Sequence, residues 1–144
     1  MKSINAWIVA LIMSSTIATT ALAAATLDAD FSRSNIRIPS SMKSGQSYDV
    51  TIKVKNVGDI KWQARDIKMK CTVKRGPSGA PTPKEEFTPE VDLSTAVNTG
   101  QTWDCRFKVR APKWTGRYTL QYSMADGRNE FGDKVDMDVE VVGD

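Results

Sequence analysis

Residues 54–62 read VKNVGDIKW, and this stretch decides the expected fold. It closes the run SYDVTIKVKN, in which apolar and polar side chains alternate. Such a period of two indicates a β-strand with one buried face. Asn56 and Gly58 are residue types that favour a turn, and Trp62 follows directly. The stretch predicts a strand, a turn, and a tryptophan that either plugs the core or serves as a ligand platform.

The same period of two recurs in four further runs, which are residues 66–74, 101–110, 116–124 and 134–142. Clusters of Gly, Pro, Asn and Asp separate the runs, for example at 39–45 and 126–133, and no helical stripe is visible after residue 25. A weaker strand ends at Pro39, and an edge strand fits residues 87–93 behind a proline-rich segment. Together these features predict an all-β protein, an antiparallel sandwich of about seven strands.

The N-terminus has the pattern of a secretory signal peptide. Lys2 precedes the apolar run IVALIMSSTIATTALA, and small residues surround Ala23. The run lacks the roughly 20 continuous apolar residues of a spanning helix. We therefore expect residues 1–23 to be a signal peptide and residues 24–144 to be one domain, exported to the periplasm or secreted, without a transmembrane segment. A short signal peptide on a small domain favours the bacterial envelope or exterior.

The chain contains two cysteines, Cys71 and Cys105. Both fall on the inward parity of their expected strands, so they could meet inside the sandwich. Export to an oxidising compartment favours a disulfide between them. The alternative is two separate buried thiols.

Composition argues against catalysis and against nucleic acid. The 144 residues include 20 Lys and Arg, 17 Asp and Glu, and no histidine. The missing histidine removes the usual general base and the commonest metal ligand. We expect no enzyme, no cofactor and no metal site. The nearly balanced charge does not call for a nucleic acid partner.

Two motifs resemble one known family. Besides VKNVGDIKW, residues 111–141 read APKWTGRYTLQYSMADGRNEFGDKVDMDVEV. Together they resemble the four-tryptophan (FW) immunoglobulin-like domain of the next-to-BRCA autophagy receptor. The matching residues are Asn56, Gly58, Trp62, Pro112, Gly116, Tyr118, Phe131 and Gly132. Tyr122 and Asp136 stand where the family has tryptophans. The resemblance implies an immunoglobulin-like sandwich that acts as a protein-interaction module, and it makes Trp62 part of the fold.

The other tryptophans divide between core and surface. Trp103 shares the inward parity of Cys105, so we expect it in the core. Trp114 lies in the loop after Pro112, where it either caps the sandwich or is exposed. An exposed aromatic beside polar groups suits a binding site. Trp114 is therefore the loop aromatic that we favour for ligand binding.

Outward-facing charges predict a second binding surface. In an immunoglobulin-like arrangement, the strands around Val50 and Cys105 share a sheet. Their outward cations would form a basic face, which consists of Lys53, Lys55, Arg106, Lys108 and Arg110. Lys68 and Lys70 would instead lie in a sheet with Asp136, Asp138 and Glu140. Ordinary protection of exposed strands by lysine is the alternative to a ligand site.

These observations predict a non-enzymatic protein-interaction or structural module of the bacterial envelope, whose partner is another envelope or extracellular protein. The alternative is a binder of carbohydrate or of an anionic envelope polymer such as an anionic polysaccharide, through the basic face and the loop aromatics.

Overall fold

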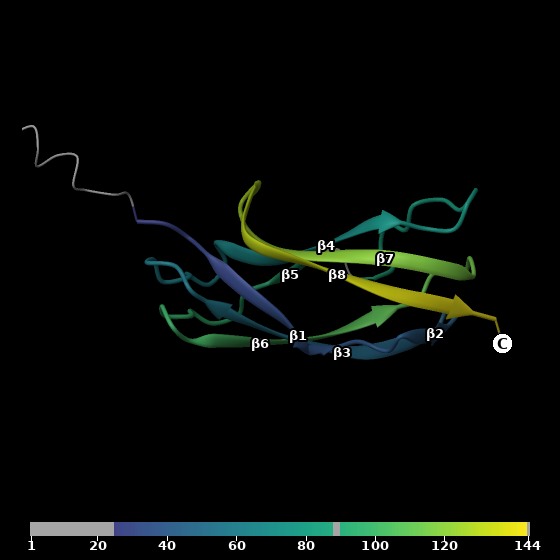
Figure 1. The fold of residues 1–144 in the computed structure, drawn as a ribbon, viewed down its shortest axis with the longest axis horizontal. Helices are drawn as coiled ribbons and strands as arrows, with labels where there is room; N and C mark the ends of the chain where they lie inside the picture. The colour runs from purple at the N-terminus through teal and green to yellow at the C-terminus, as the bar shows by residue number, and fades with distance from the viewer. Residues whose placement is uncertain (1–24, 88–89, 144) are drawn as a thin grey trace, which may run out of the picture.

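A computed structural model describes residues 25–87 and 90–143, and their regular secondary structure consists of β-strands in two sheets (Figure 1). The predicted signal peptide lies outside the described residues. Within the described ranges, no helix has the length and hydropathy needed to cross a membrane.

The first sheet has three antiparallel strands in the order β1-β3-β6. These are β1 (Ala29–Arg37), β3 (Ser47–Asn56) and β6 (Thr102–Arg110). The weak strand that was predicted to end at Pro39 is β1. The strands around Val50 and Cys105 share this sheet, as expected, with Ile52 opposite Cys105.

The second sheet has five strands in the order β2-β8-β7-β4-β5. They are β2 (Ser41–Lys43), β4 (Ile67–Arg75), β5 (Glu90–Asp92), β7 (Gly116–Asp126) and β8 (Asn129–Val142). All neighbours pair antiparallel except β2 with β8. Figure 1 shows the two sheets stacked, with β3 and β6 below β4 and β7.

The core fills the space between the two sheets with the side chains that the alternating pattern predicts. Val50, Ile52 and Val54 of β3 are buried, as are Trp103 and Cys105 of β6. From the other sheet come Tyr118, Leu120, Tyr122 and Met124 of β7 together with Val135, Val139 and Val141 of β8. The predicted all-β sandwich is therefore confirmed.

Several local details differ from the prediction. The described residues form eight strands, because β2 arises within a segment that was expected to be a turn. The expected loop at 126–133 is instead mostly the β7–β8 hairpin, with Gly127 at a φ of 62° in its turn. The edge strand is only three residues long. Phe87 precedes it in a left-handed conformation with φ of 64° and is buried.

Asn56 organises the turn that opens the motif VKNVGDIKW. Its side chain is 0% exposed. The Nδ2 group donates hydrogen bonds to the carbonyl oxygens of Ile60 and Val97, both at 3.0 Å. The Oδ1 atom accepts a hydrogen bond from the Gly58 backbone N–H at 3.0 Å. A buried amide with three partners satisfies a turn that would otherwise leave polar groups unpaired.

Two of the three motif glycines, Gly58 and Gly132, permit close approach of the N-terminal segment. A Cβ on Gly58 would lie 2.5 Å from the Thr26 oxygen. A Cβ on Gly132, whose φ is 74°, would collide with the backbone nitrogen of Ala29. Glycine is therefore needed at both positions so that the chain entering β1 can pack against the sandwich.

Trp62 is 0% exposed and lies beside this turn. Its backbone exchanges two hydrogen bonds with Val97, at 2.9 and 3.0 Å. Its ring meets Phe131 edge to face, with ring centroids 5.8 Å apart. The side chain thus fills the core and offers no surface to a ligand. We call this part of the sandwich, with Asn56, Gly58, Trp62, Phe131 and Gly132, the motif end.

Candidate binding surfaces

A groove of about 400 Å³ lies at the other end of the sandwich, beside Trp114. Trp114 is 51% exposed. The groove lies between the proline-rich segment 81–86 and residues 112–114, with Tyr118 also in its lining. Its apolar lining residues include Pro81, Pro83, Pro112, Trp114 and Tyr118. We call this part of the molecule the groove end.

The wall that carries Trp114 is held in place by hydrogen bonds that its backbone carbonyl groups accept. The Tyr118 hydroxyl donates a hydrogen bond of 2.8 Å to the Trp114 carbonyl. The Ser44 hydroxyl donates one of 2.9 Å to the carbonyl of Lys113. Gly116 has a φ of 134°, and a Cβ there would lie 2.5 Å from Pro77. The loop can therefore hold the indole ring outward without burying it.

The proline-rich wall is anchored by Phe87 and Glu86. The Phe87 N–H donates to the Arg110 carbonyl at 3.2 Å, and its ring meets that of Tyr118 at 5.3 Å. Glu86 forms an ion pair of 3.8 Å with Arg110. Burial, and then the charge of Glu86, raises the pKa of Tyr118, so its hydroxyl stays a proton donor at neutral pH. Both walls of the groove are thus tied to β6 and β7.

The lining combines flat apolar rings with both signs of charge. Lys84 and Lys113 line the groove together with Glu85 and Glu86. Aromatic and proline surfaces with a few polar groups can hold an extended peptide or a sugar ring. Sequence reasoning identified Trp114 but missed Tyr118 and Glu86 as parts of the same site. The proline cluster was the available signal, but the sequence does not reveal that this loop folds back toward β7.

The outer face of the three-stranded sheet carries all five residues of the predicted basic face in exposed positions. Acidic residues are interspersed among them. Lys108 contacts Asp49 at 2.8 Å, and Arg106 contacts Asp104 at 3.9 Å. Lys53 lies opposite Asp104 in the register of β3 and β6. The surface therefore has mixed charge, and its attraction for an anionic polymer is reduced accordingly.

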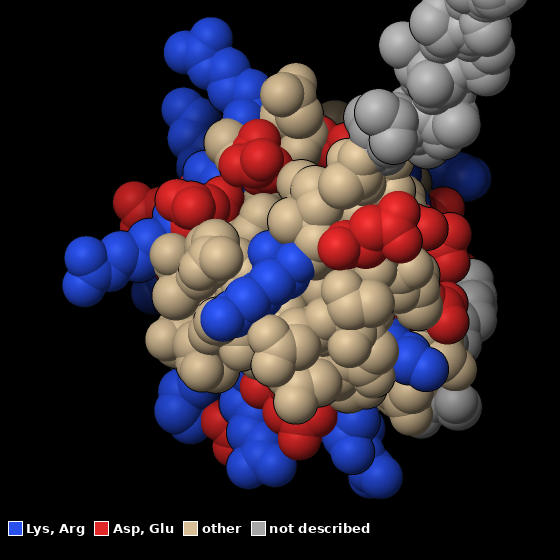
Figure 2. Space-filling view, turned by 90° about the vertical axis from the view of Figure 1, so that its left-hand side faces the viewer, with Lys and Arg blue, Asp and Glu red and all other residues tan. Residues whose placement is uncertain are grey.

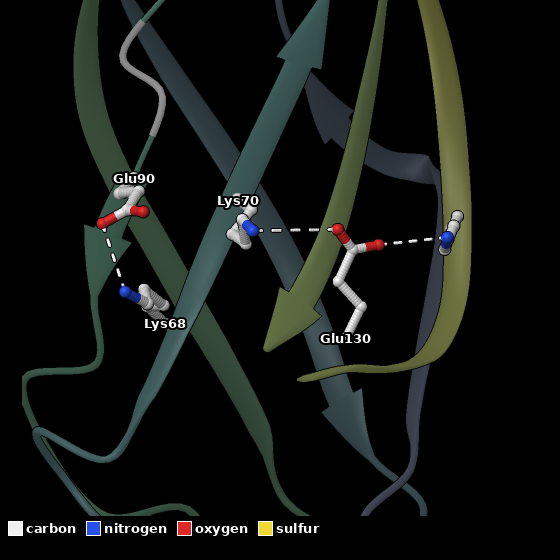
Figure 3. A network of polar contacts seen from close by, with 5 residues as sticks. Lys68, Lys70, Glu90 and Glu130 are labelled. Atoms are coloured by element: carbon white, nitrogen blue, oxygen red, sulfur yellow. Dashed lines mark hydrogen bonds and ion pairs between the residues drawn. The ribbon is translucent and has the colours of Figure 1, made fainter. Parts of the chain in front are cut away.

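The five-stranded sheet also offsets its charges across strands (Figure 3). Lys68 contacts Glu90 of β5 at 3.3 Å. Glu130 lies between two lysines, 3.9 Å from Lys70 and 3.0 Å from Lys134. Because Lys134 in particular favours its charged form, the pKa of Glu130 is lowered. The charges of Lys68 and Lys70 are thus offset across strands, as expected, but the acids in these ion pairs are Glu90 and Glu130, whereas the sequence pointed to Asp136, Asp138 and Glu140.

Figure 2 faces the motif end, where blue and red side chains are interspersed around an uncharged area. Val57 and Ile60, in the turn of VKNVGDIKW, are exposed apolar residues.

Within the described part of the chain, no group of three or more His, Cys, Asp or Glu side chains is arranged to hold a metal ion.

Cys71 and Cys105 are free thiols in the structure. Cys105 is buried and Cys71 is half-buried, on strands of different sheets. Burial raises the pKa of each thiol to about 12, so both are protonated at neutral pH. The disulfide between them stays a prediction.

Solved structures of other proteins have a similar fold. A CARDB domain from Pyrococcus furiosus, solved in solution, superposes with a TM-score of 0.54 at 14% identity, over 84% of this chain and 98% of that chain. Its crystal structure in complex with di-metal ions gives 0.53 at 15% identity, over 83% and 96%. A β-glucosidase from Listeria innocua, in complex with glucose, gives 0.50 at 16% identity over 83% of this chain but 16% of that chain.

At these identities the structural likeness concerns the fold alone. The comparison with curated proteins gives no match. The sequence itself matches the family model described as the Ig-like domain from next to BRCA1 gene, over residues 35–141. That match covers most of the chain and includes both motifs, and the protein therefore belongs to this family of Ig-like domains.

Proposed function

We propose that this protein is a non-enzymatic interaction module, exported to the bacterial envelope or exterior, that binds an extended segment of another envelope or extracellular protein in the groove beside Trp114. An Ig-like domain of this family suggests a protein-interaction module in general. The observation that carries the more specific proposal is the exposed indole of Trp114 at the rim of a groove whose two walls are anchored to the sandwich.

The chemistry of the groove suits a peptide backbone better than a charged polymer. Pro81 and Pro83 offer rigid apolar surface, and Tyr118 and Trp114 add aromatic surface. Grooves of this composition bind extended, preorganised peptides at low entropic cost. Lys113 and Glu85, one of each sign, can orient such a segment along the groove. We therefore place the partner's contact at the groove end and not on the mixed-charge outer face of the three-stranded sheet.

The test is selection from a displayed library of random dodecapeptides on the immobilised protein. We expect enriched peptides that bind the wild type and lose at least about tenfold in affinity to Trp114→Ala, because an aromatic anchor at an interface is often worth more than 1 kcal/mol. Lys61→Ala, an exposed change near the motif end, is the matched control and should leave binding unchanged. Peptides that bind Trp114→Ala equally well would refute the assignment to the groove.

Carbohydrate or anionic-polymer binding is the alternative. The feature in its favour is again Trp114, since an exposed indole can stack on a sugar ring. A glycan array probed with the wild type and with Trp114→Ala distinguishes carbohydrate binding from peptide binding. Binding of a glycan that depends on Trp114, with no peptide enriched, would favour the alternative. Binding that depends instead on Lys53 and Lys55, and that weakens with salt, would move the ligand to the basic face.

We also propose export and, with it, oxidation of Cys71 and Cys105 to a disulfide by thiol–disulfide exchange, in which the disulfide of an external oxidant takes up the two electrons and two protons and becomes a dithiol. In support, burial and then the nearby Cys71 and Cys105 raise the pKa of Tyr122, so both cysteines neighbour one phenol. The intact mass of the exported protein should correspond to a chain that starts near Ala24. Titration of the denatured, unreduced protein should find no thiol. Two thiols would refute the bridge, and an uncleaved N-terminus would refute export.

A further inference from the structure

Among the described strands, β6, which is nine residues long, pairs with β3 alone. β6 lies at the edge of its sheet and pairs with β3 through an uninterrupted register. Its sequence, TWDCRFKVR, contains neither proline nor glycine. On the side away from β3, the Phe87 N–H donates a hydrogen bond to the carbonyl of Arg110, at the last position of the strand. Exposed edges of this length are templates for another strand.

Hydrogen bonds at the two ends of β6 show which backbone groups face the open edge. Gln101 accepts a hydrogen bond from the Asn56 N–H, and the Ala111 N–H donates to Gln46, so these odd-numbered residues face the β3 side. The carbonyl of Arg110, an even-numbered residue, faces the other way, toward Phe87. Because backbone direction alternates along an antiparallel strand, the N–H and C=O groups of Thr102, Asp104 and Arg106 point to the same side as the carbonyl of Arg110, away from β3.

The charges of these side chains are complementary when two copies of β6 pair about a two-fold axis. If a second β6 pairs antiparallel with Cys105 opposite its own copy, Asp104 lies opposite Arg106, and Arg106 opposite Asp104. Shifting this register by two residues along one strand places Asp104 opposite Asp104 in one direction. In the other direction it places Arg106 opposite Arg106, with Asp104 opposite Lys108 on both sides of that pair. Opposite charges directly across strands are stabilising, and like charges are destabilising. Charge therefore favours one register over its two nearest competitors.

The inward face of the same register is also complementary. Trp103 would lie opposite Phe107 of the second copy, twice across the axis. Phe107 is only half-buried. Cross-strand aromatic pairs are among the stronger pairwise contacts in sheets. A second copy would thus extend the three-stranded sheet and cover the exposed part of Phe107.

We propose that the protein self-associates through β6, as a two-fold dimer in which the two three-stranded sheets join into one six-stranded sheet around Cys105. The occupant of the open edge is a second copy of this chain. The Trp114 groove lies beyond the C-terminal end of β6, at residues 81–86 and 112–114. The dimer would therefore carry two accessible grooves. The association is expected to be weak, because a short edge buries less than the roughly 1,200 Å² of a standard stable interface.

The test is the oligomeric state of the domain, measured by sedimentation over a concentration series up to millimolar, for four proteins. The wild type should pass from monomer to dimer. Asp104→Arg and Arg106→Asp should each weaken dimerisation about tenfold or more, since each creates two like-charge pairs. The double variant D104R/R106D restores both opposite-charge pairs and should return to within about threefold of the wild type, a rescue that a merely structural role of either residue would not give.

Two further measurements keep the outcome decisive. Lys55→Asp makes the same charge change as Arg106→Asp on the neighbouring strand, opposite Thr102 and not opposite Asp104, and should leave dimerisation unchanged. In amide exchange by NMR, the N–H groups of Asp104 and Arg106 should gain protection as concentration rises, while that of Trp114 should not. A protein that remains monomeric at millimolar concentration would overturn the proposal. A dimer without the charge-swap rescue would overturn it as well.

Discussion

Two tryptophans, each in or near a turn or bend, lie in opposite environments at the two ends of this sandwich. Trp62 at the motif end is 0% exposed, whereas Trp114 at the groove end is 51% exposed. The difference lies in what surrounds each turn. The turn before Trp62 is closed by the buried amide of Asn56 and covered by the N-terminal segment at Gly58. The loop that contains Trp114 is held through its carbonyl, which leaves the ring outside.

The comparison shows that residue type alone does not assign a tryptophan to core or surface. What decides is whether the backbone beside it is paired in a way that draws the side chain inward. Trp62 exchanges both backbone hydrogen bonds with Val97, which fixes its ring toward Phe131. At the groove end, the aromatic pair of Phe87 and Tyr118 fills the corresponding core position. The motif end is therefore built for stability, and the groove end leaves an aromatic surface available for binding.

The largest effect is expected from removing each indole in turn. Trp62→Ala should lower the free energy of unfolding by about 3–5 kcal/mol, because it empties a fully buried site. Trp114→Ala, which removes the same atoms from an exposed site, should change it by no more than about 0.5 kcal/mol. Urea denaturation of both variants, followed by far-UV circular dichroism, measures the difference. Equal losses would show that Trp114 is part of the core and would end the contrast between the two ends.

The second test breaks the turn at the motif end without touching the core. Asn56→Ala should cost about 2–3 kcal/mol, since it leaves the buried partners of the Asn56 amide unsatisfied. Asn56→Asp keeps the acceptor for the Gly58 N–H but loses both donated hydrogen bonds, so it should also destabilise at neutral pH. Thermal unfolding of the two variants gives the comparison. A stable Asn56→Ala protein would mean that the turn is held by its backbone alone.

The sequence predicts the sandwich because its strands obey a simple alternation. In β3 the buried positions Val50, Ile52 and Val54 follow the period of two without exception. The FW-type resemblance likewise placed Asn56 and Trp62 in the fold. These inferences succeed because local periodicity and a short turn motif depend on residues that are close in the chain.

The candidate site was only partly predictable, because it depends on contacts between distant segments. Trp114 stood out as a loop aromatic. The opposite wall, however, depends on Phe87 adopting a left-handed conformation and donating to Arg110. The mixed charge of the sheet face depends on pairs such as Lys108 and Asp49, which are far apart in sequence. Strand parity predicts which side chains face outward, but it does not predict which acids lie next to which bases.

A third test compares two glycines that have similar backbone conformations but different surroundings. Gly132 and Gly127 have φ values of 74° and 62°, yet a Cβ would collide with Ala29 only at Gly132. Both alanine variants should lose about 1 kcal/mol from left-handed strain. Gly132→Ala should lose about 1–2 kcal/mol more, because the chain entering β1 must move. Denaturation midpoints provide the measurement, and identical losses would show that β1 does not depend on this approach.

The smallest expected effect concerns the charges that gather at the start of β1. Desolvation, and then the neighbouring carboxylate of Asp30, raises the pKa of Asp133 above its ordinary value of 3.8. A raised pKa in the folded state means that ionisation of Asp133 opposes folding. This penalty grows as pH rises from the unfolded pKa through the folded one, and it is absent at lower pH. Asp133→Asn should therefore be slightly more stable than the wild type at pH 7.

The pH dependence of this difference distinguishes charge repulsion from a packing effect. The gain from Asp133→Asn should shrink as pH falls and vanish below about pH 3, where the carboxyl group is protonated in both folded and unfolded chains. Lys134→Gln changes the next residue without relieving the repulsion, and it also removes a contact to Glu130, so it should not stabilise the protein. Thermal unfolding of the three proteins between pH 3 and pH 7 gives the comparison. A gain that persisted at pH 3 would mean that Asn packs better than Asp, and the carboxylates of Asp30 and Asp133 would then impose no repulsive cost on the docking of β1.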